Sequence, residues 1–235
     1  MQPTHIFTNG CSFLTTRPKE GVNTHVGMLL ADSLQLETAR HLGGGGRGNK
    51  RLSVTTKVWC EKNPELAAKC FFVIGITTGQ RFDFPTFDQY KTHKFPELAT
   101  SWKTFKPHAP KEAEKFFKHL YTALKLDIDK MLQYESLEAT LNLQNYFKLK
   151  KYPYVMYKTI SDPDIKVDLK FKDVQLLWDS VDKSRYFKPE TSHRNWTDEH
   201  NQHCSPDDYH PSAEGHQDWA KQLKKFIDAN NLLTI

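Results

Sequence analysis

Short apolar runs alternate along the chain with stretches in which apolar residues recur at helical spacing. The clearest run, "CFFVIGIT", is continuously apolar and rich in aromatic and β-branched residues, which is typical of a strand buried on both faces of a parallel sheet. We predict strands at residues 4–8, 37–42, 70–77 and 152–160. We predict helices at residues 22–36, 52–59, 111–148 with a break near Tyr134, 174–181, and from about Pro211 to near residue 227.

Strands that alternate with helices predict a three-layer α/β/α domain, in which a mostly parallel central sheet carries helices on both sides. In such sheets the ligand crevice lies beyond the carboxyl ends of the strands. Ser12, the glycine-rich stretch 43–49 and Thr77 each follow a predicted strand. We therefore expect these three segments to gather at one edge of the sheet.

Two stretches lack this rhythm. Residues 79–110 combine prolines with many aromatic residues and are interpreted as an irregular insertion, and residues 188–209 are interpreted as a polar loop. The 235 residues contain no internal repeat and no Gly/Ser/Pro-rich linker, which favours a single domain spanning residues 1–235.

The charge pattern argues against several classes of protein. The 33 Lys and Arg residues exceed the 28 Asp and Glu residues only slightly, and they are interleaved with acids rather than gathered in an arginine stripe, so no nucleic-acid partner is expected. No run of 18 apolar residues is present, and the first residues resemble no signal peptide. We expect a cytoplasmic protein without a membrane partner, and the oligomeric state stays open.

The cysteines and histidines give no clear metal site. The four cysteines are widely spaced and form no CxxC pair, so a zinc ribbon is not expected and reduced thiols suit a cytoplasmic setting. Four residues near the end of the chain carry side chains that bind metal ions: His203, Cys204, His210 and His216. Their spacing, however, would place His203 and His216 away from each other. We expect neither a metal ion nor a cofactor.

The stretch "FTNGCSFL" places Ser12 directly after the first predicted strand. A serine hydroxyl becomes a nucleophile when an imidazole takes its proton and a carboxylate orients that imidazole. The segment "PDDYHPSAEGH" offers both groups, with Asp207 three residues before His210, whereas Asp208 is closer in sequence than this geometry favours. The sequence thus permits a triad of Ser12, His210 and Asp207.

Each of these residues also has a structural interpretation. Asn9-Gly10 is a common turn dipeptide, His210 is compatible with a helix-capping surface histidine, and Asp207 with a cap of the last helix. The glycine-rich stretch is compatible with a flexible loop, and Cys11 is interpreted as a buried small residue rather than as the nucleophile.

Taken in order, four blocks resemble those of the SGNH (GDSL) hydrolases. They are Gly10-Cys11-Ser12, the glycine-rich loop, Gly75-x-Thr77 and Asp207-x-x-His210-Pro211. Cys11 stands where Gly-Asp-Ser has its aspartate, a variant that is similar to a subgroup of small members. The resemblance implies an SGNH-like fold with Ser12 as nucleophile, His210 as general base and then acid, and Asp207 as orienting carboxylate.

The resemblance also implies an oxyanion hole formed by the backbone N–H of Ser12, a glycine N–H and an asparagine side chain. Gly48 is the favoured glycine and Gly46 the alternative. Thr77 stands where the asparagine is expected, so Thr77, Thr78 or Asn49 must replace it, or the site is weakened. One oxyanion donor contributes about 10² to 10³ in turnover.

We interpret the chain as a serine esterase that hydrolyses a small acyl ester through an acyl-enzyme, with an acetyl group on a carbohydrate favoured. Arg81, Phe82 and the aromatic residues after them are assigned either to substrate binding or to covering the sheet edge. Two alternatives remain open: an acyltransferase that uses the same site, and a catalytically weak binding protein of this fold.

Overall fold

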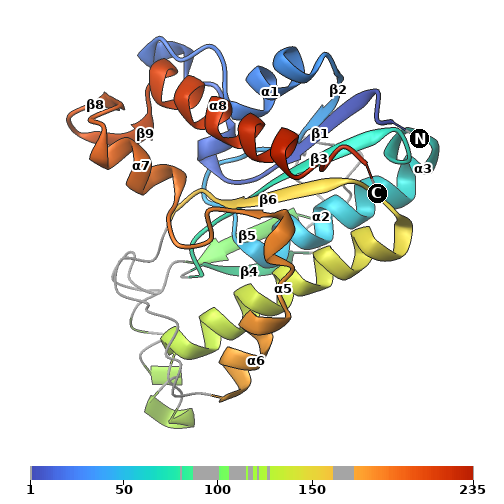
Figure 1. Cartoon of the computed structure of the whole chain (residues 1–235). Helices are drawn as coiled ribbons and strands as arrows, with labels where there is room; N and C mark the ends of the chain where they lie inside the picture. Colours follow the sequence, from blue (N-terminus) through green and yellow to red (C-terminus); the bar gives the residue numbers. More distant parts are fainter. Residues whose placement is uncertain are drawn as a thin grey trace.

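The central element is a five-stranded parallel sheet in the order β2-β1-β3-β6-β7 (Figure 1). The computed structural model describes residues 2–79, 81–86, 101–105, 115, 119–120, 122–125, 128–160 and 172–234. The strands are β1 (His5–Asn9), β2 (Glu37–His41), β3 (Cys70–Ile76), β6 (Tyr154–Lys158) and β7 (Tyr186–Phe187). All seven residues of β3 are buried, as its continuous apolar run predicts.

Helices cover both faces of this sheet (Figure 1). Helices α1 (Val26–Leu34) and α8 (Ala213–Ala229) pack together on one face, and α2 (Asn49–Lys62) and α5 (Ile128–Lys150) pack together on the other. Side chains of adjacent strand residues point to opposite faces, so Ile6 and Phe71 join the core under α8 while Phe7 and Phe72 join the core under α2 and α5. The predicted three-layer α/β/α architecture is confirmed.

Smaller elements complete the described part of the chain. They are the helices α3 (Pro64–Ala67), α6 (Lys172–Ser180) and α7 (His193–Glu199), the 3-10 helices η1 (Ser12–Leu14), η2 (Pro18–Glu20) and η3 (Lys183–Arg185), and two antiparallel hairpins, β4 (Phe82–Thr86) with β5 (Ser101–Phe105) and β8 (His203–Ser205) with β9 (Asp208–Pro211). The β8–β9 hairpin and α7 lie beside the end of the sheet near the start of α8 (Figure 1).

Three details of the sequence interpretation are wrong. Helix α5 runs through Tyr134 without a break. The stretch 188–209 is not a loop throughout, because it contains α7 and β8. Pro211 ends strand β9 rather than opening α8, whose N-cap is Ser212; the Ser212 hydroxyl accepts a hydrogen bond from the Gly215 N–H at 3.1 Å.

The insertion at 79–110 is partly regular, since β4 and β5 pair as a hairpin. Its remaining aromatic residues, and most of 111–127, lie outside the described residues. Among the helices of the described ranges, none is both long enough and apolar enough to cross a membrane.

Candidate active site

The nucleophile candidate, Ser12, lies just past the carboxyl end of the central strand β1. The side-chain amide of Asn9, the last residue of β1, donates hydrogen bonds to the Thr55 hydroxyl at 3.0 Å and the Thr56 hydroxyl at 2.9 Å. Gly10 then allows a close turn, because a Cβ atom there would lie 2.4 Å from Leu14 Cδ1. The chain enters η1 at Ser12, whose N–H has no acceptor within that short helix.

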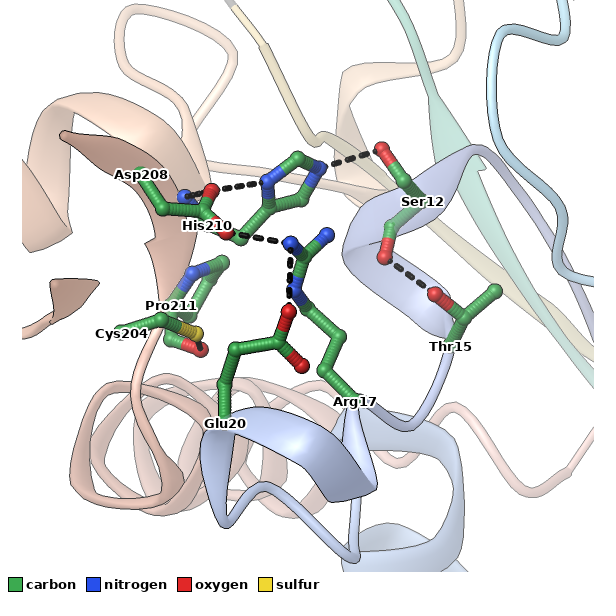
Figure 2. Close-up of polar contacts among 8 residues, drawn as sticks. All are labelled: Ser12, Thr15, Arg17, Glu20, Cys204, Asp208, His210 and Pro211. Atoms are coloured by element: carbon green, nitrogen blue, oxygen red, sulfur yellow. Dashed lines mark hydrogen bonds and ion pairs between the residues drawn. The ribbon is translucent and has the colours of Figure 1, made fainter.

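His210 reaches Ser12 from the other end of the chain. Its Nε2 atom lies 2.7 Å from Ser12 Oγ, although 198 residues separate the two (Figure 2). The imidazole also packs against the Phe13 ring of η1, with 5.2 Å between ring centroids. The β8–β9 hairpin thus presents His210 to the loop after β1.

Asp208, not Asp207, is the carboxylate that contacts His210. Asp208 Oδ1 lies 2.5 Å from His210 Nδ1 and also accepts the His210 backbone N–H at 3.0 Å. Asp207 lies exposed in the turn between β8 and β9. The reason is the strand: residues two apart on β9 point to the same face, which pairs Asp208 with His210 and leaves Asp207 outside.

The second oxygen of Asp208 faces Arg17 (Figure 2). The Arg17 guanidinium pairs with Asp208 Oδ2 and lies 3.4 Å from Glu20 Oε1. Burial alone would raise the pKa of Asp208, but hydrogen bonds from His210 and the positive charge of Arg17 outweigh it and lower that pKa. Asp208 is therefore held as a carboxylate.

This arrangement is suited to proton transfer. With its proton on Nδ1 facing the Asp208 carboxylate, the imidazole keeps Nε2 as an acceptor for the Ser12 hydroxyl. The opposite tautomer would place an N–H against Ser12 and leave Nδ1 facing a carboxylate without a hydrogen. The geometry thus favours an activated serine.

Cys11 is fully buried behind this site, as the sequence interpretation expects. Its Sγ atom lies 3.1 Å from the Thr159 hydroxyl. The thiol therefore faces the protein interior.

The glycine-rich loop passes closely over η1. A Cβ atom on Gly43 would lie 2.0 Å from the Leu14 carbonyl oxygen, and the Gly44 N–H donates to the Gly10 carbonyl at 3.2 Å. Arg47 is buried beneath the loop and contacts Asn9 Oδ1 at 3.4 Å. Burial, with a smaller effect of Arg51, lowers the Arg47 pKa to about 10. The loop is thereby tied to the end of β1.

Gly48, the favoured glycine donor, already has an acceptor. Its N–H donates to Asp83 Oδ1 at 3.1 Å, and the Arg51 N–H donates to Asp83 Oδ2 at 2.9 Å. Asp83 belongs to β4, within the insertion, and is 3% exposed. Its carboxylate caps the N-terminus of α2, an interaction that the sequence did not suggest. The alternative, Gly46, has a left-handed φ of 73° and no neighbouring atom within 4 Å of a Cβ position.

Asn49 joins the second and third blocks. Its side-chain amide donates to the Thr77 carbonyl at 2.9 Å and to Ser136 Oγ at 2.6 Å, and its Oδ1 accepts the Thr77 N–H at 2.8 Å. Both amide hydrogens are therefore used within the protein. This arrangement disfavours Asn49 as an oxyanion donor.

Thr77 is buried, and its hydroxyl accepts a hydrogen bond from Arg81 Nη1 at 2.9 Å. Because Arg81 supplies the donor, the hydroxyl hydrogen of Thr77 stays available. Arg81 also donates to the Arg47 carbonyl at 2.9 Å, so its guanidinium is held by the protein. Thr78 is half-buried beside Thr77, and Phe82 opens β4 with a side chain outside the described part of the structure.

Three buried histidines and the half-buried His41 lie next to this site. His25 and His41 make an edge contact at 4.6 Å between ring centroids, and His193 lies 5.2 Å from His216. Burial, together with the nearby His41 and His216, lowers the pKa of His25 to about 3. Burial also lowers the pKa of His41 to about 4. Burial and the nearby His210 lower the pKa of His216 to about 4. The folded protein keeps these rings neutral.

We expect this cluster to make the fold acid-sensitive. In the unfolded chain a histidine binds a proton near pH 6.5, whereas His25 in the folded protein does so only near pH 3. The stability that neutral His25 contributes is therefore fully present above pH 6.5 and is lost progressively as the pH falls from 6.5 toward 3. His25→Asn removes the titrating ring but retains an acceptor for the Gly27 N–H at the N-cap of α1. Between pH 7.5 and 5.5, the variant should lose about 1 kcal/mol less unfolding free energy than the wild type.

Urea unfolding at the two pH values measures this difference. His200→Asn is the control for the same chemical change at an exposed histidine. An equal loss of stability in His25→Asn and the wild type would contradict the prediction.

Comparison with solved structures supports the fold. EstA, a psychrotrophic esterase from Pseudoalteromonas sp. whose structure was solved inhibited by monoethylphosphonate, is similar with a TM-score of 0.52 and 8% identity over 96% of this chain and 97% of that chain. A putative lipolytic protein of the G-D-S-L family from Desulfitobacterium hafniense DCB-2 is similar with a TM-score of 0.47 and 13% identity over 95% of this chain and 99% of that chain. Axe2, an acetylxylan esterase from Geobacillus stearothermophilus, is similar with a TM-score of 0.47 and 13% identity over 96% of this chain and 94% of that chain.

No protein-family model and no curated protein matches the chain by sequence. The similarity to EstA shows the fold, an SGNH-like α/β fold with a parallel sheet between helices.

Proposed function

We propose that this protein is a serine esterase that removes a small acyl group through an acyl-enzyme. The observation that carries the proposal is the continuous line of contacts from Asp208 through His210 to Ser12, with distances of 2.5 and 2.7 Å. These three residues lie at the carboxyl edge of a parallel sheet, which is where such folds bind ligands.

In the acylation step, His210 Nε2 takes the hydroxyl proton while Ser12 Oγ bonds to the ester carbonyl carbon. The tetrahedral intermediate collapses when the C–O bond to the alcohol breaks and the imidazolium returns the proton to the leaving oxygen. A water molecule, deprotonated by His210, then attacks the acyl-Ser12 carbonyl; the bond to Ser12 Oγ breaks, the imidazolium returns the proton to Ser12 Oγ, and the acid is released. Asp208 stabilises the imidazolium formed in both steps.

The oxyanion needs hydrogen-bond donors near Ser12. We assign the Ser12 N–H and the Thr77 hydroxyl to this role. Strands β1 and β3 are adjacent and parallel, and Asn9 of β1 lies opposite Ile74 of β3. Ser12 comes three residues after Asn9, and Thr77 comes three residues after Ile74, so both follow the same end of the strand pair. The Arg81 hydrogen bond to Thr77 Oγ1 leaves the hydroxyl hydrogen for the substrate. The Gly48 N–H becomes a third oxyanion donor only when its hydrogen bond to Asp83 breaks.

Replacement of Thr77 tests this assignment. Thr77→Val keeps the shape of the side chain but removes the hydroxyl, and it should lower kcat by about 10²-fold, since a single oxyanion donor contributes that much. Thr77→Ser retains the hydroxyl and should stay within about threefold of the wild type. Thermal melting of both variants controls for stability, and an unchanged kcat in a folded Thr77→Val protein would refute the assignment.

An acetyl ester of a carbohydrate is the substrate class that we favour. The aromatic residues of the insertion are compatible with stacking against sugar rings, and β4 of that insertion lies against the N-terminus of α2 through Asp83. The same acyl-enzyme would pass its acyl group to an alcohol if water were kept out, so an acyltransferase would use the same residues.

One observation favours a second candidate, a binding protein with weak turnover. The N–H of Gly48, the glycine favoured from the sequence as an oxyanion donor, is hydrogen-bonded to Asp83 instead. A site without that donor would form the acyl-enzyme slowly.

The proposal is tested by hydrolysis of 4-nitrophenyl acetate and of acetylated sugars, followed by release of acetate, with 4-nitrophenyl octanoate as the long-chain comparison. We expect saturable turnover with acetyl preferred over octanoyl. Adding glycerol distinguishes the transferase, because acetylated glycerol would then appear in place of acetate. Absence of turnover with every ester would contradict the esterase and favour the binding protein.

A further inference from the structure

Arg17 joins the two ends of the chain that form the site. It lies five residues after Ser12 in the sequence, and its guanidinium forms an ion pair with Asp208, 191 residues away (Figure 2). Both side chains are mostly covered, with 24% of Arg17 and 21% of Asp208 exposed. An ion pair this sheltered is screened less than one in open solvent.

The backbone around Arg17 is fixed independently of that ion pair. The Arg17 N–H donates to the Val22 carbonyl at 2.7 Å, and the Val22 N–H donates to the Arg17 carbonyl at 3.0 Å. On the other side, the Thr15 hydroxyl donates to the Ser12 carbonyl at 2.7 Å. Arg17 therefore projects from a segment that is tied directly to the nucleophile.

The two oxygens of Asp208 have separate partners. Oδ1 accepts hydrogen bonds from His210 Nδ1 and from the His210 N–H, which is a local interaction between residues two apart. Oδ2 is bound by Arg17. Without Arg17, the carboxylate would be anchored through one oxygen only and would be able to rotate away from the imidazole. Binding at both oxygens removes that freedom.

We propose that Arg17 is a positioning residue for Ser12 and His210: it binds the Asp208 oxygen that does not face His210 and so holds the carboxylate against the imidazole. The inference rests on the proposed esterase function. Glu20 Oε1 lies 3.4 Å from the same guanidinium nitrogen of Arg17.

The test compares Arg17→Gln and Arg17→Lys with the wild type on 4-nitrophenyl acetate. Because Arg17 touches no reacting atom, Arg17→Gln should lower kcat about 10- to 100-fold, as a misplaced catalytic group does, and leave KM within about threefold. Arg17→Lys retains a cation that is able to reach Asp208 and should recover part of this loss. The matched control is Arg194→Gln, which removes an arginine paired with Asp198 and should keep wild-type kcat.

A second background separates positioning from a general structural effect. In Asp208→Asn, Arg17 no longer has the Asp208 carboxylate to hold against His210, so adding Arg17→Gln should cost less than about twofold further in kcat. Thermal melts accompany each variant, and if Arg17→Gln fails to fold, Arg17→Lys in the two backgrounds decides by the same comparison.

Two results would overturn the inference while the wild type remains active: an Arg17→Gln kcat within twofold of the wild type, or an equal loss in the Asp208→Asn background. A wild type without any turnover has a different meaning, because it removes the proposed esterase function and this inference with it.

Discussion

Replacement of Ser12 with alanine is expected to lower esterase kcat by about 10⁴- to 10⁶-fold, because the nucleophile that forms the acyl-enzyme is lost. The Ser12 hydroxyl makes its hydrogen bond to His210 at 2.7 Å, and its carbonyl, which the substitution keeps, accepts the Thr15 hydroxyl. The fold should therefore stay intact. Turnover of 4-nitrophenyl acetate and a thermal melt measure the two effects.

Cys11→Ala is the matched control for this prediction. The Cys11 thiol is buried against Thr159 and is adjacent to Ser12 in the sequence, so a thiol nucleophile would lose activity in this variant. We expect Cys11→Ala to retain most of the kcat. A Ser12→Ala protein with wild-type turnover would show that another group carries the reaction.

The second large effect is expected at Asp208. Asp208→Asn retains the size of the side chain but removes the charge that orients His210 and stabilises the imidazolium, so kcat should fall by about 10⁴-fold. Asp207→Asn, one residue away in the exposed turn, should leave kcat within about twofold. Steady-state kinetics of this adjacent pair identify the carboxylate directly.

The opposite outcome, a large loss in Asp207→Asn and little loss in Asp208→Asn, would support the original family assignment. It would also mean that the hairpin pairs His210 differently from the 2.5 Å contact described above.

The central sheet was predictable because its signals are local. The apolar run of β3 needs burial on both faces to be satisfied, and the fully buried side chains of Trp219, Leu223 and Ile227 recur at helical spacing in α8. These patterns determine which face of an element is buried whatever the distant contacts are. The position of Ser12 at the carboxyl edge of the sheet followed from the predicted first strand, whereas His210 was paired with Ser12 only because a serine nucleophile needs an imidazole.

The carboxylate that contacts His210 was harder to predict. The choice of Asp207 assumed a turn leading into a helix that begins near Pro211, whereas the segment forms strand β9. The strand is only four residues long and depends on pairing with β8, so its own sequence carries little strand signal. In a strand, residues two apart share a face, so Asp208 lies on the same face as His210.

Arg17 and Asp83 had no local signal. Both act through side-chain contacts with residues far away in the sequence, Asp208 in one case and Gly48 in the other. Arginine in a polar segment and aspartate in an aromatic insertion fit solvent-exposed positions equally well. Only the three-dimensional arrangement distinguishes these alternatives.

The central claim, an activated serine at position 12, is tested most directly by intact-mass analysis after treatment with a small fluorophosphonate. Wild type, Ser12→Ala and Cys11→Ala are treated in parallel. We expect one stoichiometric adduct on wild type and Cys11→Ala, located at Ser12 by peptide mapping, and none on Ser12→Ala. An unmodified wild type, or an adduct that persists in Ser12→Ala, would show that Ser12 is not an activated nucleophile.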